Sequence, residues 1–297
     1  MPTAVPNPRR FLSADGLIDT LRFRFNQISD SRREASVIYP LPNVLMAAFA
    51  MFSLKDPSLL AFQERINDEA IKSLYHLDAI PSDSQMRDIL DPIDPELLND
   101  CFLDIFYELQ RGGVLKDFVF DDGYYLIAID GTGHFCSTTI RCEHCLEKNS
   151  KSGKTVYHHQ AVVATLVHPD RRETFPLAIE PVVKQDGENK NDCERNATRR
   201  LLKRLRLQYP KLKMMVVEDG LAGNGPHIRD LKELGFSFLL GAKPGDHKYL
   251  FEQFIQANDR DEVETTTEDL KGGGLGQTQY ALGLPLNASQ SEVLLGF

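Results

Sequence analysis

The sequence lacks any apolar run long enough to form a membrane-spanning helix. Its longest run, Val44 to Phe52, falls well short of the roughly 20 residues that a helix needs to cross a bilayer. The first residues also lack the apolar segment and small-residue cleavage site that mark a secreted protein. We therefore expect a cytoplasmic protein with no membrane partner.

Cysteine is scarce, and the five that are present form an odd set scattered along a chain of 297 residues. Such a set argues against the disulfide framework of a small secreted protein, so reduced thiols are expected. The cysteines are Cys101, Cys136, Cys142, Cys145 and Cys193.

The chain also has few basic residues for a protein that binds nucleic acid. It has 34 lysines and arginines against 43 acidic residues, a formal net charge of −9, whereas contacts with DNA phosphates require basic surface. Net charge alone therefore argues against a nucleic-acid partner. One segment nevertheless indicates a nucleic-acid partner, because it contains many basic residues and no acidic residue. The basic residues are Arg195, Arg199, Arg200, Lys203, Arg204, Arg206, Lys211 and Lys213.

The pattern of apolar residues predicts an α/β protein. Residues 1–118 show helical periodicity divided by prolines, which predicts an all-helical region with helices over 17–28, 44–54, 58–66 and 96–115. Short β-rich runs at 124–130, 158–169 and 173–183 then precede a helix, a strand, a helix and a strand, an order of βββαβαβ. We expect this core over residues 119–250. Residues 251–297 have a weaker pattern and are interpreted as an incomplete insertion or a flexible tail.

Within the helical region, Ser82 and Gln85 have the spacing of a capping box, which predicts the start of a short helix. The helix could belong to a helix-turn-helix that binds DNA ends, or it could be purely structural. The structural interpretation is favoured because most short capped helices are structural.

Two aspartates stand where an apolar strand gives way to small residues. Asp130 follows the strand at 124–130 and Asp219 follows the strand at 213–219. If these strands are neighbours, both carboxylates emerge at the carboxyl ends of the strands and converge. We expect their separation to be on the order of 4 to 7 Å, with Mg²⁺ or Mn²⁺ between them, because hard oxygen ligands suit these ions. The alternative is that each aspartate only caps a turn.

The order of strands, with an aspartate on the first and the fourth, resembles the ribonuclease H-like core of DDE transposases. The amino-acid sequence is similar to that of one bacterial insertion-sequence group, the IS-four-like transposases, over most of the chain. The stretches that carry the resemblance, in order, are IAIDGTGHFCS, IRCEHCLEK, YHHQAVVATLVHPD, QDGENKNDCERNA, VVEDGLAGNGPHI and GAKPGDHKYLF.

This resemblance implies a DNA transposase that cleaves phosphodiester bonds at the ends of an element and joins the freed 3′ hydroxyl to target DNA. Asp130 and Asp219 would be the catalytic residues and the ligands of Mg²⁺ or Mn²⁺. The partner would be double-stranded DNA, both terminal repeats and target, in the bacterial nucleoid, and a homodimer on DNA is one arrangement that it allows. Glu218 is the rival of Asp219, but alternation along a strand predicts that its side chain points to the opposite face.

The chain departs from the family at the third acidic ligand, a glutamate that the family carries on a helix after an insertion. No glutamate downstream has family-like flanks, so we expect this chain, which the sequence presents as C-terminally truncated, to be inactive and to perform neither hairpin formation nor strand transfer. One alternative function is a catalytically dead DNA-binding remnant. Another is a ribonuclease H-like nuclease in which Glu194 completes the metal site, although a glutamate there also suits the helix dipole.

Two further groups invite a functional interpretation. Cys142 and Cys145 form a C-x-x-C motif, with histidines at 144, 158 and 159, but a second cysteine pair is missing, so surface thiols are favoured over a zinc site. The basic helix predicted over 191–208 either is a solvated face or contacts the DNA backbone, and the fold context favours DNA. The residues expected to bind DNA share one face: Arg199, Lys203 and Arg206.

Overall fold

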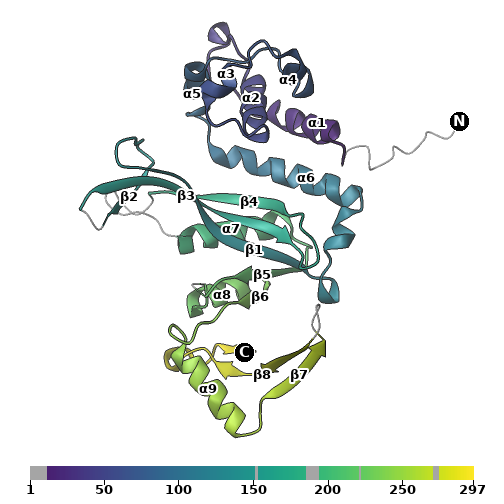
Figure 1. The fold of residues 1–297 in the computed structure, drawn as a ribbon, viewed down its shortest axis with the longest axis vertical. Helices are drawn as coiled ribbons and strands as arrows, with labels where there is room; N and C mark the ends of the chain where they lie inside the picture. The colour runs from purple at the N-terminus through teal and green to yellow at the C-terminus, as the bar shows by residue number, and fades with distance from the viewer. Residues whose placement is uncertain (1–11, 151–152, 185–193, 221, 270–273) are drawn as a thin grey trace, which may run out of the picture. The chain divides into compact units, whose positions relative to one another are not determined.

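The structure is a computed structural model that describes residues 12–150, 153–184, 194–220, 222–269 and 274–297. It is an α/β fold with a mixed sheet and flanking helices (Figure 1). The chain forms two compact units, one of residues Met1–Val119 and Thr165–Pro181 and one of Phe120–Ala164 and Val182–Phe297. No helix in the described part of the chain is both long and apolar enough to cross a membrane.

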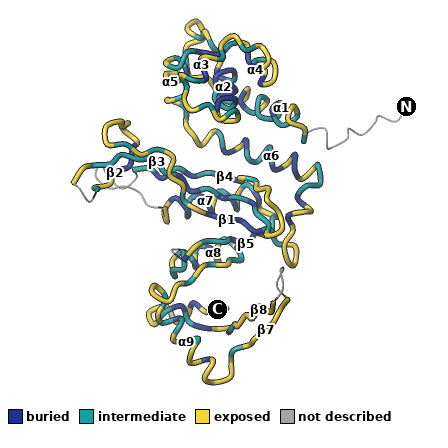
Figure 2. The backbone as a smooth tube through the Cα atoms, in the orientation of Figure 1, coloured by how far each residue is buried: buried dark blue, intermediate teal, exposed yellow. Residues whose placement is uncertain are grey.

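The helices that precede the first strand are packed around α2, the most apolar of them. Four of its side chains, at Val44, Met46, Ala47 and Ala50, are completely buried, as the dark tube of α2 in Figure 2 shows. Each of the four stretches predicted to be helical contains a helix, with bounds that differ by a few residues, whereas α4 lies where no helix was predicted. The helices are α1 (Ala14–Phe25), α2 (Leu41–Ser53), α3 (Leu59–Gln63), α4 (Glu69–Leu74), α5 (Asp83–Leu90) and α6 (Asn99–Arg111), with 3-10 turns η2 (Glu34–Ser36), η3 (Pro95–Leu98) and η4 (Val114–Phe118).

The capping box at the start of α5 is confirmed. The Ser82 side chain accepts a hydrogen bond from the Gln85 backbone N–H, and the Gln85 side chain accepts one from the Ser82 backbone N–H. Two donors at the helix start are thereby satisfied. Met86 on this helix is completely buried in the helical core, which gives α5 a structural task. DNA binding by this segment stays a prediction.

The sheet has the strand order β2-β3-β1-β5-β6, and β4 pairs with β3. Its central strands β1 and β5 are parallel, as are β5 and β6, whereas β2 and β3 are antiparallel. The short β2 was not predicted, because its sequence LEKN is mostly polar and exposed. The strands are β1 (Tyr125–Ser137), β2 (Leu146–Asn149), β3 (Thr155–Val167), β4 (Phe175–Val182), β5 (Met214–Glu218) and β6 (Ser237–Leu240), and β1 follows the 3-10 turn η5 (Asp121–Gly123).

The basic helix is confirmed as α7 (Glu194–Gln208); its predicted first residues, 191–193, and most of the stretch QDGENKNDCERNA lie outside the described residues. The predicted apolar stripe of Ala197, Leu201 and Leu205 is completely buried, which fixes the helix against the protein. Helix α8 (Gly225–Glu233) follows β5.

Residues beyond β6 are ordered into further elements. Helix α9 packs Leu250 and Ala257 against Ala281 and Leu284 in a small core of their own. The hairpin of β7 and β8 was not predicted, since β7 is exposed at every position and shows no alternation (Figure 2). The glycines at 272 and 273 lie outside the described residues. The elements are α9 (Lys248–Asp259), β7 (Glu264–Asp269), β8 (Leu275–Tyr280), β9 (Leu284–Pro285), η6 (Ala288–Gln290) and β10 (Leu294–Leu295).

Candidate active site

The two predicted aspartates stand level with each other on neighbouring parallel strands. In the register of β1 and β5, Ala128 lies opposite Val217, and two residues further along each strand come Asp130 and Asp219. Neighbouring strands lie about 4.8 Å apart, so this register holds the two side chains close together. Both residues are exposed. Strand β1 continues through Asp130 to Ser137, whereas the sequence predicted that it would end at Asp130.

Both aspartates line one cavity of about 410 Å³. The cavity lies within the unit that contains β1, β5, α7 and α8. Its walls come from β1 and β3, from the end of β5 and the loop that follows it, and from the first turns of α7 and α8: Ile129, Asp130, Gly131, Val162, Glu194, Arg195, Thr198, Glu218, Asp219, Ala222, Asn224 and His227.

A third carboxylate, that of Glu194, lies in the same cavity. Its Oε1 would be 2.6 Å from a Cβ atom placed on Gly131, so the absent side chain of that glycine leaves the space in which the carboxylate sits. The Gln160 side-chain amide donates a hydrogen bond to Glu194 Oε1, which orients it. Glu194 thus lies against the residue that follows Asp130. Sequence analysis gave Glu194 only a secondary role.

Glu218 and Asp219 both border the cavity, although strand alternation predicts opposite faces. Glu218 is the last residue of β5 and Asp219 follows the strand, so alternation no longer applies between them. Glu218 Oε2 lies 2.5 Å from His227 Nε2, and the two side chains are only 7% and 10% exposed. This buried pair joins β5 to the first turn of α8, where the Asn224 side chain caps the helix. Sequence analysis missed His227; its place in the first turn after a strand-end loop is the available signal.

Comparison with protein-family models and with curated proteins gives no match for this chain. The functional argument therefore rests on the residues of the cavity.

The donor set of the cavity fits Mg²⁺ or Mn²⁺, because these ions prefer carboxylate oxygen ligands. Asp130, Asp219 and Glu194 supply such oxygens from three different segments. Their carboxylate oxygens do not all lie within 4.8 Å of one another. Among the described residues, the group that meets this spacing is Cys142, Cys145 and His159. Carboxylates that flank a pair of ions about 4 Å apart need not meet it. The expected separation of the two aspartate carboxylates stays a prediction.

The three basic residues predicted to bind DNA differ in their contacts. Arg206 donates hydrogen bonds to the backbone oxygens of Leu234, Leu212 and Gly235, and its guanidinium lies 4.3 Å from the centre of the Phe236 ring. Burial lowers the pKa of Arg206. These contacts give Arg206 a structural task that sequence analysis missed.

The other two basic residues of this set are more accessible. Arg199 is half-exposed and pairs with Asp230 at 2.7 Å, and Lys203 is exposed. A DNA contact stays a prediction for all three.

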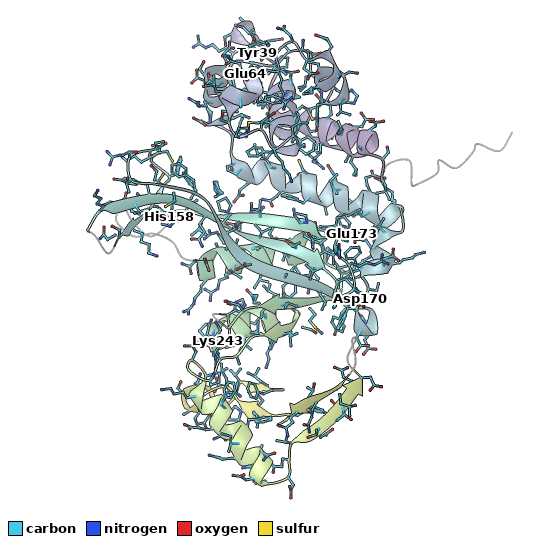
Figure 3. The ribbon with its side chains drawn as sticks, viewed as in Figure 1. Tyr39, Glu64, His158, Asp170, Glu173 and Lys243 are labelled. Carbon is cyan, nitrogen blue, oxygen red and sulfur yellow. The ribbon has the colours of Figure 1, made fainter. Side chains whose placement is uncertain are left out.

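A second cavity, of about 420 Å³, shares Arg195 and Asn224 with the first. It is also lined by Lys248 and His247 at the start of α9. His247 links two of the segments around this cavity, because its Nε2 lies 2.8 Å from the Gly223 oxygen and its Nδ1 accepts a hydrogen bond from the Lys243 backbone N–H. Figure 3 labels Lys243 in the segment between β6 and α9. The second cavity thus adds Lys248 and Asp246 beside the first cavity, and Arg195 borders both.

Proposed function

We propose that this protein cleaves phosphodiester bonds of DNA at the cavity that holds Asp130 and Asp219, as a transposase of the DDE, ribonuclease H-like class. The observation that carries the proposal is the shared register of the two aspartates on neighbouring parallel strands, opening into one cavity with Glu194. This arrangement is not required by the alternative that each aspartate only caps a turn, because a turn cap needs neither a second aspartate nor a cavity. Besides Glu218, which pairs with His227, three carboxylates border the cavity, and carboxylates held close together repel each other unless a cation lies near them.

The fold supports this proposal in its order of elements. Leaving aside the short β2, the chain runs through three strands, a helix, a strand, a helix and a strand, with β1, β5 and β6 parallel. This is the order that the resemblance to a ribonuclease H-like core implies. Cavities at the carboxyl ends of parallel strands are a usual place for active sites in α/β folds.

Asp130 and Asp219 would hold Mg²⁺ or Mn²⁺, with Glu194 as the third carboxylate. Such ions activate a water or hydroxyl nucleophile and stabilise the leaving oxygen of an in-line displacement at phosphorus. Gln160 fixes the direction of the Glu194 carboxylate. Because His227 engages Glu218, we propose that Asp219, and not Glu218, is the metal ligand at the end of β5.

The rest of the DNA strand would lie along the second cavity, which is lined by Arg195 and Lys248 as well as by Asp246. Arg195 borders both cavities, and Lys248 lies further along the second. A scissile phosphate at the three carboxylates therefore places the adjoining phosphates next to these two cations, whose charge offsets that of the DNA backbone. The exposed Lys203 and half-exposed Arg199 on α7 are the further contacts that we propose.

A second candidate function is a ribonuclease H-like nuclease that hydrolyses nucleic acid without strand transfer. The position of Glu194 favours it, because this residue supplies a third carboxylate within the described part of the chain. The two candidates share the first chemical step. They differ in whether a freed 3′ hydroxyl then attacks a second DNA.

The experiment that tests the proposal measures nicking of supercoiled plasmid with Mn²⁺. The sequence alone predicts an inactive chain, because no third carboxylate is found downstream. Since Glu194 borders the cavity, we instead expect nicking by the wild-type chain and its loss in Asp130→Asn and Asp219→Asn. Asp170→Asn is the matched control, since Asp170 lies in the turn between β3 and β4 and not at the cavity (Figure 3). Loss of nicking in Glu194→Gln without any joining of DNA ends selects the nuclease. DNA binding by a wild-type chain that never nicks identifies a catalytically dead binding protein and refutes the proposal.

A further inference from the structure

Two cysteines and one histidine meet next to the β2–β3 hairpin, apart from the carboxylate cavity. Cys142 and Cys145 lie in the connection from β1 to β2, and His159 lies on β3. The two Sγ atoms are 3.6 Å apart, and His159 Nε2 lies 3.3 Å from Cys142 Sγ and 3.4 Å from Cys145 Sγ. Three potential ligand atoms therefore form a nearly equilateral triangle.

These separations match the edges of a zinc tetrahedron. With Zn–S bonds of about 2.3 Å and Zn–N bonds of about 2.0 to 2.1 Å, tetrahedral angles place two sulfurs about 3.8 Å apart and a sulfur and a nitrogen about 3.6 Å apart. The observed distances are shorter by only about 0.2 Å. A disulfide would require the sulfurs to be about 2 Å apart, and both cysteines are free.

The surroundings of the triangle also suit a metal. Cys145 is buried, and the turn is closed by the Cys145 backbone N–H, which donates to the Cys142 oxygen. The Cys142 backbone N–H points at Cys145 Sγ at 3.2 Å, a hydrogen bond that favours a thiolate. The His159 ring is stacked on the His134 ring with centroids 5.7 Å apart. The Cys142–Cys145 turn and the His159 ring are thus positioned without a bound ion.

We propose that Cys142, Cys145 and His159 bind a zinc ion, with the fourth position open to water or to another ligand. Soft thiolates and an imidazole favour Zn²⁺ over the Mg²⁺ that we propose for the carboxylate cavity. The ion links the β1–β2 connection to β3, so its task is to hold this hairpin in place. Because Gln160 follows His159 on β3, the ion also steadies the strand that supplies the hydrogen-bond donor to Glu194.

Only one of the two adjacent histidines takes part, because successive residues of a strand point to opposite faces. His158 pairs in register with Leu146 of β2, and Figure 3 labels it on the hairpin. The chain therefore offers matched controls. His158→Gln is the control for His159→Gln, and the exposed free Cys136 provides Cys136→Ser as the control for Cys142→Ser.

The test is a titration of the reduced, metal-free full chain with Co²⁺ and then Zn²⁺, followed by absorption. We expect about one equivalent to bind, with thiolate-to-cobalt charge-transfer bands and the intense visible bands of a tetrahedral ion, and Zn²⁺ should abolish both. Cys142→Ser and His159→Gln should weaken binding by about 100-fold, while Cys136→Ser and His158→Gln should not. The wild-type spectrum needs no variant, so a misfolded variant cannot decide the outcome.

Two results would overturn the zinc site. One is a cobalt spectrum without thiolate bands. The other is Zn²⁺ binding that persists in Cys142→Ser but disappears in Asp130→Asn, which would move the ion to the carboxylate cavity. Thiolate bands that persist in Asp130→Asn support the cysteine site independently of the proposed DNA cleavage.

Discussion

Replacing Gly131 with alanine tests whether Glu194 belongs to the active site without removing its carboxylate. The added Cβ would lie 2.6 Å from Glu194 Oε1 and 2.7 Å from its Cδ, whereas ordinary contacts begin at 3.4 Å. The carboxylate must therefore retreat by about 0.8 Å. A misplacement of about 1 Å at a reacting centre can cost roughly 100-fold in rate, so we expect DNA nicking to fall by about that factor.

The same substitution should leave the fold intact. The atoms in the way belong to the far end of a flexible, exposed side chain, which can move at little cost. An alanine in a strand also reduces the freedom of the unfolded chain, which raises the free energy of unfolding by up to about 1 kcal/mol. The midpoint temperature of thermal unfolding should thus be unchanged or slightly higher. Gly133→Ala on the same strand is the control, since its nearest atom is 3.9 Å away.

The assay compares nicking rates of Gly131→Ala, Glu194→Gln and the double variant under Mn²⁺. If both changes act through one carboxylate, the double variant should be no slower than Glu194→Gln, a coupling that independent sites do not show. A Gly131→Ala variant that nicks at the wild-type rate, beside an inactive Asp130→Asn, would refute the role of Glu194. The metal ligands would then be the two aspartates alone.

Three further outcomes follow from the packing of single side chains. Arg206→Ala should lower the free energy of unfolding by about 1 to 2 kcal/mol in a urea titration, because three hydrogen bonds and a ring contact are lost. An unchanged urea midpoint would show that these contacts do not stabilise the fold. Lys203→Gln should leave stability unchanged but reduce the slope of log affinity for duplex DNA against log salt by about 0.9; an unchanged slope argues against a phosphate contact. Burial raises the pKa of the Cys101 thiol to about 12, so iodoacetamide at neutral pH should label the exposed Cys136 long before Cys101, and equal labelling would contradict the burial of Cys101.

The sequence was most informative where burial imposes a period. The stripe of α7 was predicted because Leu201 and Leu205 face the interior at helical spacing, and the two aspartates were found because they end apolar strands. The hairpin of β7 and β8 was missed because exposed strands carry no such pattern. Arg206 was assigned to a DNA-binding face because the sequence does not reveal that three backbone carbonyls lie within its reach.

The site itself could be predicted only in part. Glu194 remained a secondary candidate, since a glutamate in the first turn of a helix also has a favourable interaction with the helix dipole. Its proximity to Gly131 depends on how α7 packs near β1, which no local pattern encodes. The cysteines of the C-x-x-C motif were interpreted as surface thiols because a second cysteine pair is missing, and the sequence does not reveal that His159 Nε2 lies within 3.4 Å of both sulfurs.

The measurement that tests the central claim most directly is Mn²⁺-dependent nicking of supercoiled plasmid by the wild-type chain beside Asp130→Asn and Asp219→Asn. Our account predicts nicking by the wild type that requires the ion, with a loss of at least about 100-fold in each variant and wild-type rates in Asp170→Asn. Nicking at equal rates in all four proteins, or none by a wild-type chain that binds both Mn²⁺ and DNA, would contradict it.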